Sequence, residues 1–124
     1  MQRELFREFN ERYDKLNSNL YLIKDKYPTL SDLETAENPD QLKNTIIDFF
    51  NLCAEEYYWY HHKGRIDKLI WTSWQDGMNF WFKVPAIQDL WRIEVDSNGM
   101  SSYYIDDNKG FFMDNSKENE VNKS

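Results

Sequence analysis

The sequence predicts an all-α fold, a compact bundle of four to five helices with a short irregular element at the C-terminal end. Apolar residues recur at alternating steps of three and four along most of the chain, which is the spacing of a helix that buries one face. Only four glycines and three prolines interrupt 124 residues, so long helices are favoured. Aromatic residues form 17% of the chain and give one core large flat side chains to pack. We therefore expect a single helical domain over residues 1–112 and a polar, disordered tail over residues 113–124.

The clearest helical pattern covers residues 2–27. Its apolar positions form a heptad seam made of Phe6, Phe9, Tyr13, Leu16, Leu20, Ile23 and Tyr27. Two acid–base pairs stand four residues apart on other faces, Glu8 with Arg12 and Glu11 with Lys15. Pro28 disfavours helical geometry at the residue before it and ends the helix. The seam either packs inside the bundle or pairs with its copy in a homodimer through this first helix.

The next stretch connects two helices and contains a short helical turn, because Ser31 and Glu34 have the spacing of a capping box. Asn38 can then cap a second long helix that has Pro39 at its first position. This helix is expected over residues 39–63, and its apolar face consists of Leu42, Ile46, Phe49, Phe50, Cys53, Tyr57 and Tyr60.

Gly64 follows two histidines and a lysine, which is typical of a helix C-terminus. A third helix begins directly after it, with Asp67 as its N-cap and with Ile66 placed to pack on Trp71 as a hydrophobic staple. The apolar face of this helix consists of Ile70, Trp71, Trp74, Met78, Trp81 and Phe82. Gly77 is a weak point inside it.

Pro85 suits the first turn of a fourth helix, which carries Ile87, Leu90 and Trp91 and ends near residues 96–99. Residues 100–113 can form either a short helix or a hairpin, and the pattern does not choose between the two. The all-helical prediction therefore covers the chain up to this element.

Composition narrows the class of protein. A net charge of −7 disfavours direct binding to nucleic acid, because phosphate contacts require lysine and arginine. Cys53 has no partner for an internal disulfide, so we expect a reducing, cytoplasmic location. No stretch of the chain approaches the apolar length of a membrane span, so we expect no membrane contact.

Two carboxylates and both histidines lie close together in the run "LCAEEYYWYHHKGRID" (residues 52–67), which raises the question of a metal or acid–base site. Helical metal sites use Glu and His three positions apart, but Glu55 and His61, like Glu56 and His62, are six apart. We therefore interpret the run as a solvated helix end and expect no metal and no cofactor. Cys53 lies on the apolar stripe, where burial makes a thiol inert, and no catalytic motif is present. The prediction is a protein that is not an enzyme.

Two groups of residues are candidates for binding a partner. Tyr58 and Trp59 point away from the Cys53 stripe, and they belong either to the domain's own core, which we favour, or, with His62, to an exposed interface. The second group is acidic, since residues 28–40 hold four acids and no base; its candidate residues are Asp32, Glu34 and Glu37.

Residues 38–92 resemble a bacterial family of helical proteins, domain of unknown function 4760. The resemblance depends on the run "NTIIDFFNLCAEEYYWYHHKGRID", on "IWTSWQDGMNFW" and on Pro85. It implies a helical core of two helices joined by a turn and carries no catalytic residues. Members of that family often place a membrane helix ahead of this core, whereas the first helix here is charged and amphipathic.

These observations predict a small soluble, non-enzymatic protein of bacterial or phage origin that acts by binding another protein. The alternative is a phage-encoded acidic inhibitor of a host defence system or nuclease, working as a nucleic-acid mimic or a protein blocker. That alternative requires its acidic side chains to converge on one surface; they are Asp32, Glu34, Glu37, Asp40, Asp106 and Asp107.

Overall fold

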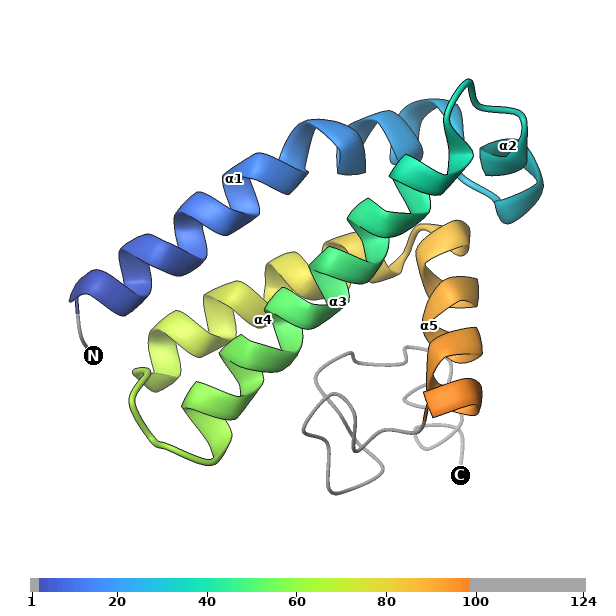
Figure 1. Ribbon diagram of the computed structural model, residues 1–124. Coiled ribbons are helices and arrows are strands. Elements are labelled where there is room, and N and C mark those ends of the chain that lie inside the picture. Colours follow the sequence, from blue (N-terminus) through green and yellow to red (C-terminus); the bar gives the residue numbers. More distant parts are fainter. Residues whose placement is uncertain (1–2, 99–124) are drawn as a thin grey trace, which may run out of the picture.

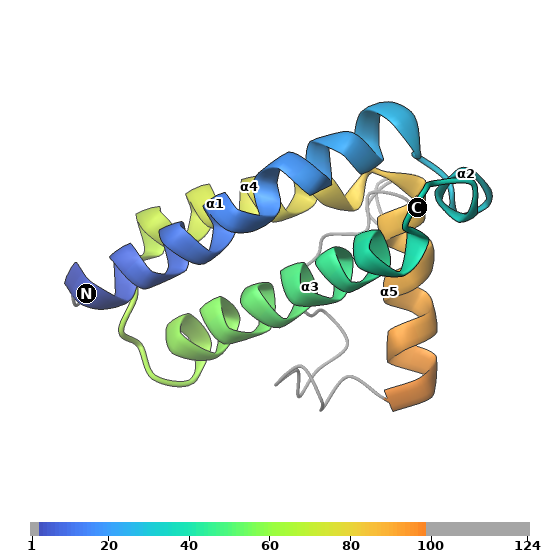
Figure 2. The ribbon, with the colours of Figure 1, turned by 45° about the horizontal axis from the view of Figure 1, so that its top comes forward.

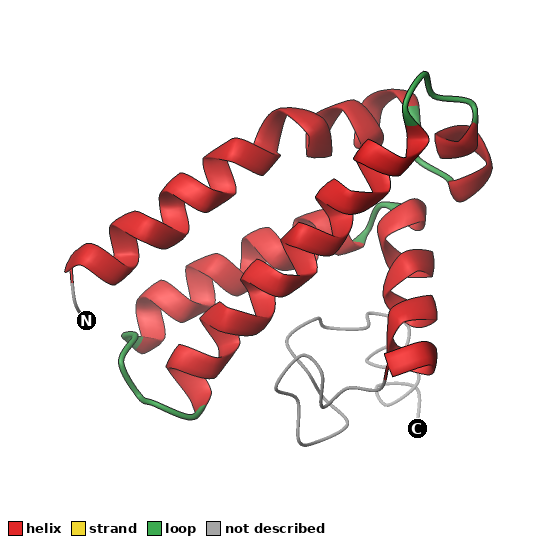
Figure 3. Cartoon of the chain, viewed as in Figure 1, coloured by secondary structure: helices red, strands yellow, loops and turns green. Residues whose placement is uncertain are grey.

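Five α-helices follow one another in the computed structural model, which describes residues 3–98 (Figure 1). They are α1 (Arg3–Lys26), α2 (Leu30–Glu34), α3 (Pro39–His61), α4 (Lys68–Phe82) and α5 (Pro85–Asn98). Only turns and short loops join them within this part of the chain (Figure 3). The predicted all-α fold is confirmed for these residues. The element at 100–113 and the tail at 113–124 lie outside the described residues.

Three long helices lie side by side, and a fourth crosses their end. α1 and α4 run in the same direction, α3 runs beside them in the opposite direction, and α5 turns away near the end of α4 (Figures 1 and 2). α3 is the central helix, because Leu52, Cys53 and Ala54 are all buried although they are consecutive. Consecutive helical residues point about 100° apart, so neighbouring elements cover α3 on several sides.

The heptad seam of α1 faces the bundle. Phe9, Leu20 and Ile23 are buried, whereas Phe6, in the second turn, remains 37% exposed. The expected pair of Glu8 with Arg12 is present. Glu11 differs from the expectation, because it pairs with Arg7 in the preceding turn at 3.7 Å rather than with Lys15 in the following one.

The short helix α2 begins two residues earlier than the capping-box spacing predicted. Thr29 has an extended backbone, and its hydroxyl accepts a hydrogen bond from the backbone N–H of Asp32 at 3.0 Å. Its carbonyl accepts the first helical hydrogen bond, from Leu33, whose side chain is buried. Ser31 therefore lies inside the helix, and its assignment as the N-cap was wrong. The burial of Leu33 determines that Thr29, and not Ser31, is the N-cap of α2.

The caps of α3 and the turn after it follow the sequence closely. The side chain of Asn38 accepts from the backbone N–H of Gln41 at 3.3 Å, and its amide donates to the Gln41 side chain at 3.2 Å. The helix ends at His61, two residues before the predicted end. Gly64 adopts a φ of 60°, the left-handed conformation that glycine takes without strain.

α4 begins where predicted, but its N-cap is incomplete. Asp67 has the extended backbone of an N-cap residue and its carbonyl accepts from Trp71, yet its side chain makes no capping hydrogen bond. Ile66 and Trp71 are both buried, as the hydrophobic staple requires. Apolar packing therefore does more than capping to start this helix.

Large aromatic side chains bridge α1 and α4. Trp74 packs edge-on against Phe9 with 5.6 Å between ring centroids, and Trp81 packs edge-on against Tyr21 at 4.7 Å. The indole N–H of Trp81 also donates to the hydroxyl of Tyr13 at 2.9 Å. These indoles and rings fill the space between two parallel helices, which explains the aromatic composition.

The last helix packs against α2, α3 and α4 and is also bonded to the chain after α1. The backbone N–H of Ala86, in the first turn of α5, donates to the carbonyl of Pro28, just after α1, at 2.8 Å. Farther along α5, the indole of Trp91 packs edge-on against Phe50 of α3, with 5.0 Å between ring centroids. Together these contacts fix α5 across the end of the bundle.

Candidate functional site

The two carboxylates of residues 52–67 have different environments. Glu55 forms an ion pair with Arg12 of α1 and is partly exposed. Glu56 is only 8% exposed, so the interpretation of this run as a solvated helix end was wrong for Glu56. The reason is its position on α3, three residues after Cys53 and seven after Phe49, which places it on a face that packs inside.

Burial raises the pKa of Glu56 from 4.5 to about 8. The positive charge of Arg12 acts in the opposite direction, and the neighbouring carboxylate of Glu55 adds to the rise. Glu56 is therefore mainly protonated at neutral pH and can donate a hydrogen bond, which an ionised carboxylate cannot. Burial likewise raises the pKa of Cys53 well above its usual value, with the Glu56 carboxylate as a second cause.

This buried group of side chains suits packing better than catalysis. Cys53 is 1% exposed, and a thiol with a raised pKa is a poor nucleophile. His61 and His62 lie beyond the core on the exposed end of α3, where the ring of His61 stacks on Tyr57 at 4.9 Å. Among residues 3–98, no three or more His, Cys, Asp or Glu side chains gather as a metal site would require.

The aromatic candidates for partner binding are only partly exposed. Tyr58 and Trp59 are half-buried and lie edge to face at 6.1 Å, and Trp59 packs against the core. His62 is exposed, with its ring 5.5 Å from that of Tyr58. The structure thus brings these residues together at the end of α3, with Trp59 contributing to the domain's own packing.

The acidic candidates lie on α2 and on the connection after it. Asp32, Glu34 and Glu37 are all exposed. Glu34 is already compensated by an ion pair with Lys43 of α3. Asp106 and Asp107 lie outside the described residues, so the convergence of the six acids on one surface stays a prediction.

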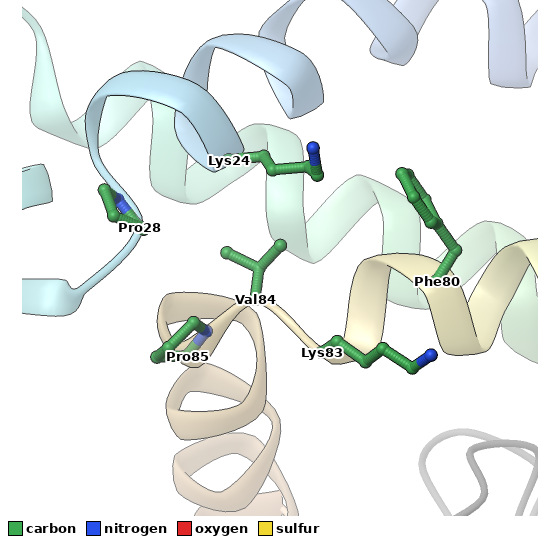
Figure 4. A pocket seen from close by; sticks show the side chains of 6 residues that line it. All are labelled: Lys24, Pro28, Phe80, Lys83, Val84 and Pro85. Atoms are coloured by element: carbon green, nitrogen blue, oxygen red, sulfur yellow. The ribbon is translucent and has the colours of Figure 1, made fainter.

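A recess that the sequence did not predict lies where α1 and α4 end and α5 begins (Figure 4). Its volume is about 350 Å³. Four apolar and two cationic residues line it: Pro28, Phe80, Val84, Pro85, Lys24 and Lys83. In Figure 4, the side chain of Lys24 points toward Phe80, and Val84 lies below Lys24.

Two exposed aromatic rings stand beside this recess. Tyr21 is 43% exposed and Phe80 is 41% exposed. The ammonium of Lys24 lies 5.9 Å from the centre of the Tyr21 ring and 5.4 Å from that of Phe80. Both rings pack on the buried indole of Trp81, at 4.7 and 4.9 Å, which holds them in place. We call Tyr21, Lys24, Phe80, Lys83 and the recess together the Tyr21–Phe80 surface.

Comparisons with known proteins do not indicate a family for this chain. No family model, curated protein or solved structure matches this chain. The resemblance of residues 38–92 to domain of unknown function 4760 therefore stays a prediction. Among the described helices, none is long and apolar enough to cross a membrane.

The signal that could have found this surface is the position of the rings relative to the buried stripes. Tyr21 stands one residue after the seam position Leu20, and Phe80 stands one residue before the buried Trp81. A residue next to a buried position points about 100° away from it, toward the edge of the helix face. Large aromatic residues at such edges are candidates for exposure.

Proposed function

We propose that this protein is not an enzyme and acts by binding another protein through the Tyr21–Phe80 surface. The observation that carries the proposal is the pair of exposed aromatic side chains, held side by side on Trp81 next to an apolar recess. Aromatic residues dominate the binding energy of protein interfaces, and rings fixed by a buried neighbour lose little conformational freedom on binding.

The ionisable groups support a binding role rather than a chemical one. Those with displaced pKa values, Glu56 and Cys53 above all, are enclosed in the core, where a substrate has no contact with them. The buried thiol also suits the reducing cytoplasm, which we propose as the location. The acidic-inhibitor alternative has less support, because Lys43 compensates one of its carboxylates.

Photo-crosslinking tests the proposal in the cells in which the protein occurs. A benzophenone amino acid replaces Phe80 in one variant and Leu69, which is 84% exposed in the first turn of the same helix, in a control variant. We expect a discrete adduct with one other protein from position 80 and not from position 69. The captured protein, once purified, should bind the wild-type chain and lose about tenfold in affinity for Phe80→Asp.

Two results would count against this function. Identical adducts from both positions would indicate random collision rather than a defined surface. Equal affinity of the captured protein for the wild type and for Phe80→Asp would show that the interface lies elsewhere.

A further inference from the structure

We infer that the Tyr21–Phe80 surface recognises an acidic segment of its protein partner, which places one bulky apolar side chain in the recess and its flanking carboxylates at Lys24 and Lys83. This inference rests on the proposed function and specifies the chemistry of the partner. It follows from the walls of the recess, from its charges and from the way its walls are fixed.

The walls suit an apolar side chain. Pro28, Val84 and Pro85 present aliphatic surface and Phe80 adds an aromatic face, so the only polar side chains among the six lining residues are those of the two lysines. A volume of about 350 Å³ is at the small end of protein ligand pockets. This combination fits an anchoring side chain of a larger partner, because the rings of Tyr21 and Phe80 extend the apolar area beyond the recess.

The charge of the recess is opposite to that of the whole chain. The protein carries a net charge of −7, yet the six residues that line the recess include two lysines and no acid. Lys24 is partly compensated, with its ammonium 3.7 Å from a carboxylate oxygen of Asp25. Lys83 is exposed, and within residues 3–98 no carboxylate forms an ion pair with it. The carboxylates of an acidic partner segment would be attracted to these two cations. The negative charge of the protein would repel such a segment less here than elsewhere on the molecule.

The walls are fixed before any partner arrives. Pro28 and Pro85 have restricted backbones, and the carbonyl of Pro28 accepts a hydrogen bond from the backbone N–H of Ala86, which joins the chain after α1 to the start of α5. Val84 is 5% exposed and its backbone N–H donates to the carbonyl of Trp81. A preformed recess keeps the ordering cost of binding low, which favours recognition of a short segment.

Lys24 and Lys83 also stand at the C-terminal ends of α1 and α4, where a cation is favourable to the helix dipole. This structural role alone would explain their presence. It would leave the choice of ligand unaffected, so a comparison of differently charged ligands separates the two explanations.

Capped synthetic peptides test the inference by two-dimensional NMR on the isotopically labelled full chain. The first peptide has a central tryptophan with two glutamates on each side, the second has lysines in place of the glutamates, and the third has alanine in place of the tryptophan. We expect the first peptide to shift the backbone amides of Lys83, Val84 and Ala86. The second and third should bind at least roughly fivefold more weakly, since each loses either the charge match or the anchor.

Charge reversal provides the matched control. Lys83→Glu should weaken binding of the first peptide by roughly fivefold. Lys68→Glu makes the same change of charge at the other end of α4, about 22 Å away, and should leave the affinity unchanged. Thermal unfolding of both variants shows that each is folded before binding is compared.

The outcomes separate this inference from the proposed function. Equal affinity for the acidic and basic peptides, or no shift with millimolar acidic peptide, would overturn the acidic chemistry, whereas a crosslinked partner from position 80 would still support binding at this surface. Tighter binding of decanoate than of the first peptide would also overturn it, because the recess would then be a small-molecule pocket. Loss of the position-80 adduct would overturn the proposed function itself.

Discussion

At the scale of single residues, the buried carboxyl group of Glu56 is expected to make the stability of the protein depend on pH. An ionised carboxylate is costly to bury, and this one has Arg12 as its compensating charge while Glu55 competes for the same guanidinium. Keeping the proton avoids most of that cost. The fold therefore depends on a proton that an unfolded chain would release well below neutral pH.

Glu56 should make stability fall as the pH rises. Its folded pKa of about 8 exceeds its ordinary 4.5, so between these values the folded chain binds more protons than the unfolded chain. The stabilising contribution is complete below pH 4.5 and is lost as the pH approaches 8, at about 1 kcal/mol per pH unit. Glu56→Gln should remove this slope and be more stable than the wild type near neutral pH. Urea unfolding at several pH values measures it.

The exposed Glu37 supplies the control for that experiment. Glu37→Gln should keep the pH slope of the wild type. Parallel slopes for the wild type and Glu56→Gln would contradict the burial of a protonated carboxyl at this position.

The sequence contained a signal that position 56 is buried, but none that Glu56 keeps its proton there. Phe49, Cys53, Glu56 and Tyr60 follow heptad spacing along α3, so a buried position 56 could be predicted by extending the seam. A glutamate is normally predicted to be exposed to solvent, because carboxylates are rarely buried without a partner. Its burial depends on how α1 packs there, which one helix does not determine.

At the scale of elements, the helices could be predicted because the spacing of the apolar residues and the capping residues indicate the same boundaries. The predicted second long helix ends two residues later than α3, and its N-cap Asn38 is the observed one. The start of α2 was not predictable in the same way, because Thr29 and Ser31 both offer a capping hydroxyl. The choice follows from the burial of Leu33, a contact with the rest of the molecule.

Removing the two hydroxyl groups in turn should distinguish these caps. Thr29→Ala should destabilise the protein by about 1 kcal/mol, because the N–H of Asp32 loses its acceptor. Ser31 is exposed and lies inside the helix, so Ser31→Ala should change stability by less than about 0.5 kcal/mol. Chemical denaturation of the two variants measures both values, and equal losses would contradict the assignment of Thr29 as the cap.

Two glycines should respond to alanine with opposite signs. Gly77 lies inside α4, and a Cβ added there meets no atom within 4 Å, so Gly77→Ala should stabilise the protein by about 0.5–1 kcal/mol. Gly64 has a φ of 60°, so Gly64→Ala should destabilise it by about 1 kcal/mol despite equally open space. Thermal unfolding tests the pair, and the same sign for both would show that these backbone conformations are not the cause.

At the scale of the whole molecule, the candidate site is a product of assembly. Its walls come from the end of α1, the end of α4 and the start of α5, positions that are far apart in the sequence (Figure 4). Periodicity predicts which face of one helix is buried, but it does not predict which helix ends meet. This explains why sequence reasoning selected Tyr58, Trp59 and His62 for partner binding and missed the recess.

The molecule should unfold as one unit, because α5 is attached both to the end of α1 and to α3. Trp91→Ala removes the contact with Phe50 and should cost about 3 kcal/mol or more. Ile93→Ala on the same helix is the control, since Ile93 is 50% exposed and should lose less than about 1 kcal/mol. Circular dichroism and tryptophan fluorescence should give coincident transitions for both variants. Separate transitions for Trp91→Ala would mean that α5 is an independent unit.

The hydrogen bond between Pro28 and Ala86 has a consequence for synthesis on the ribosome. When only α1, α2 and α3 of a nascent chain have left the ribosome, Tyr21 is present, but Phe80 of α4 and Pro85 of α5 are not. The carbonyl of Pro28 receives its partner only after the start of α5 has emerged. The surface that we assign to partner binding is therefore completed only after the start of α5 has emerged, and a partner that recognises it distinguishes folded helical domains from chains in which α5 has not yet been made.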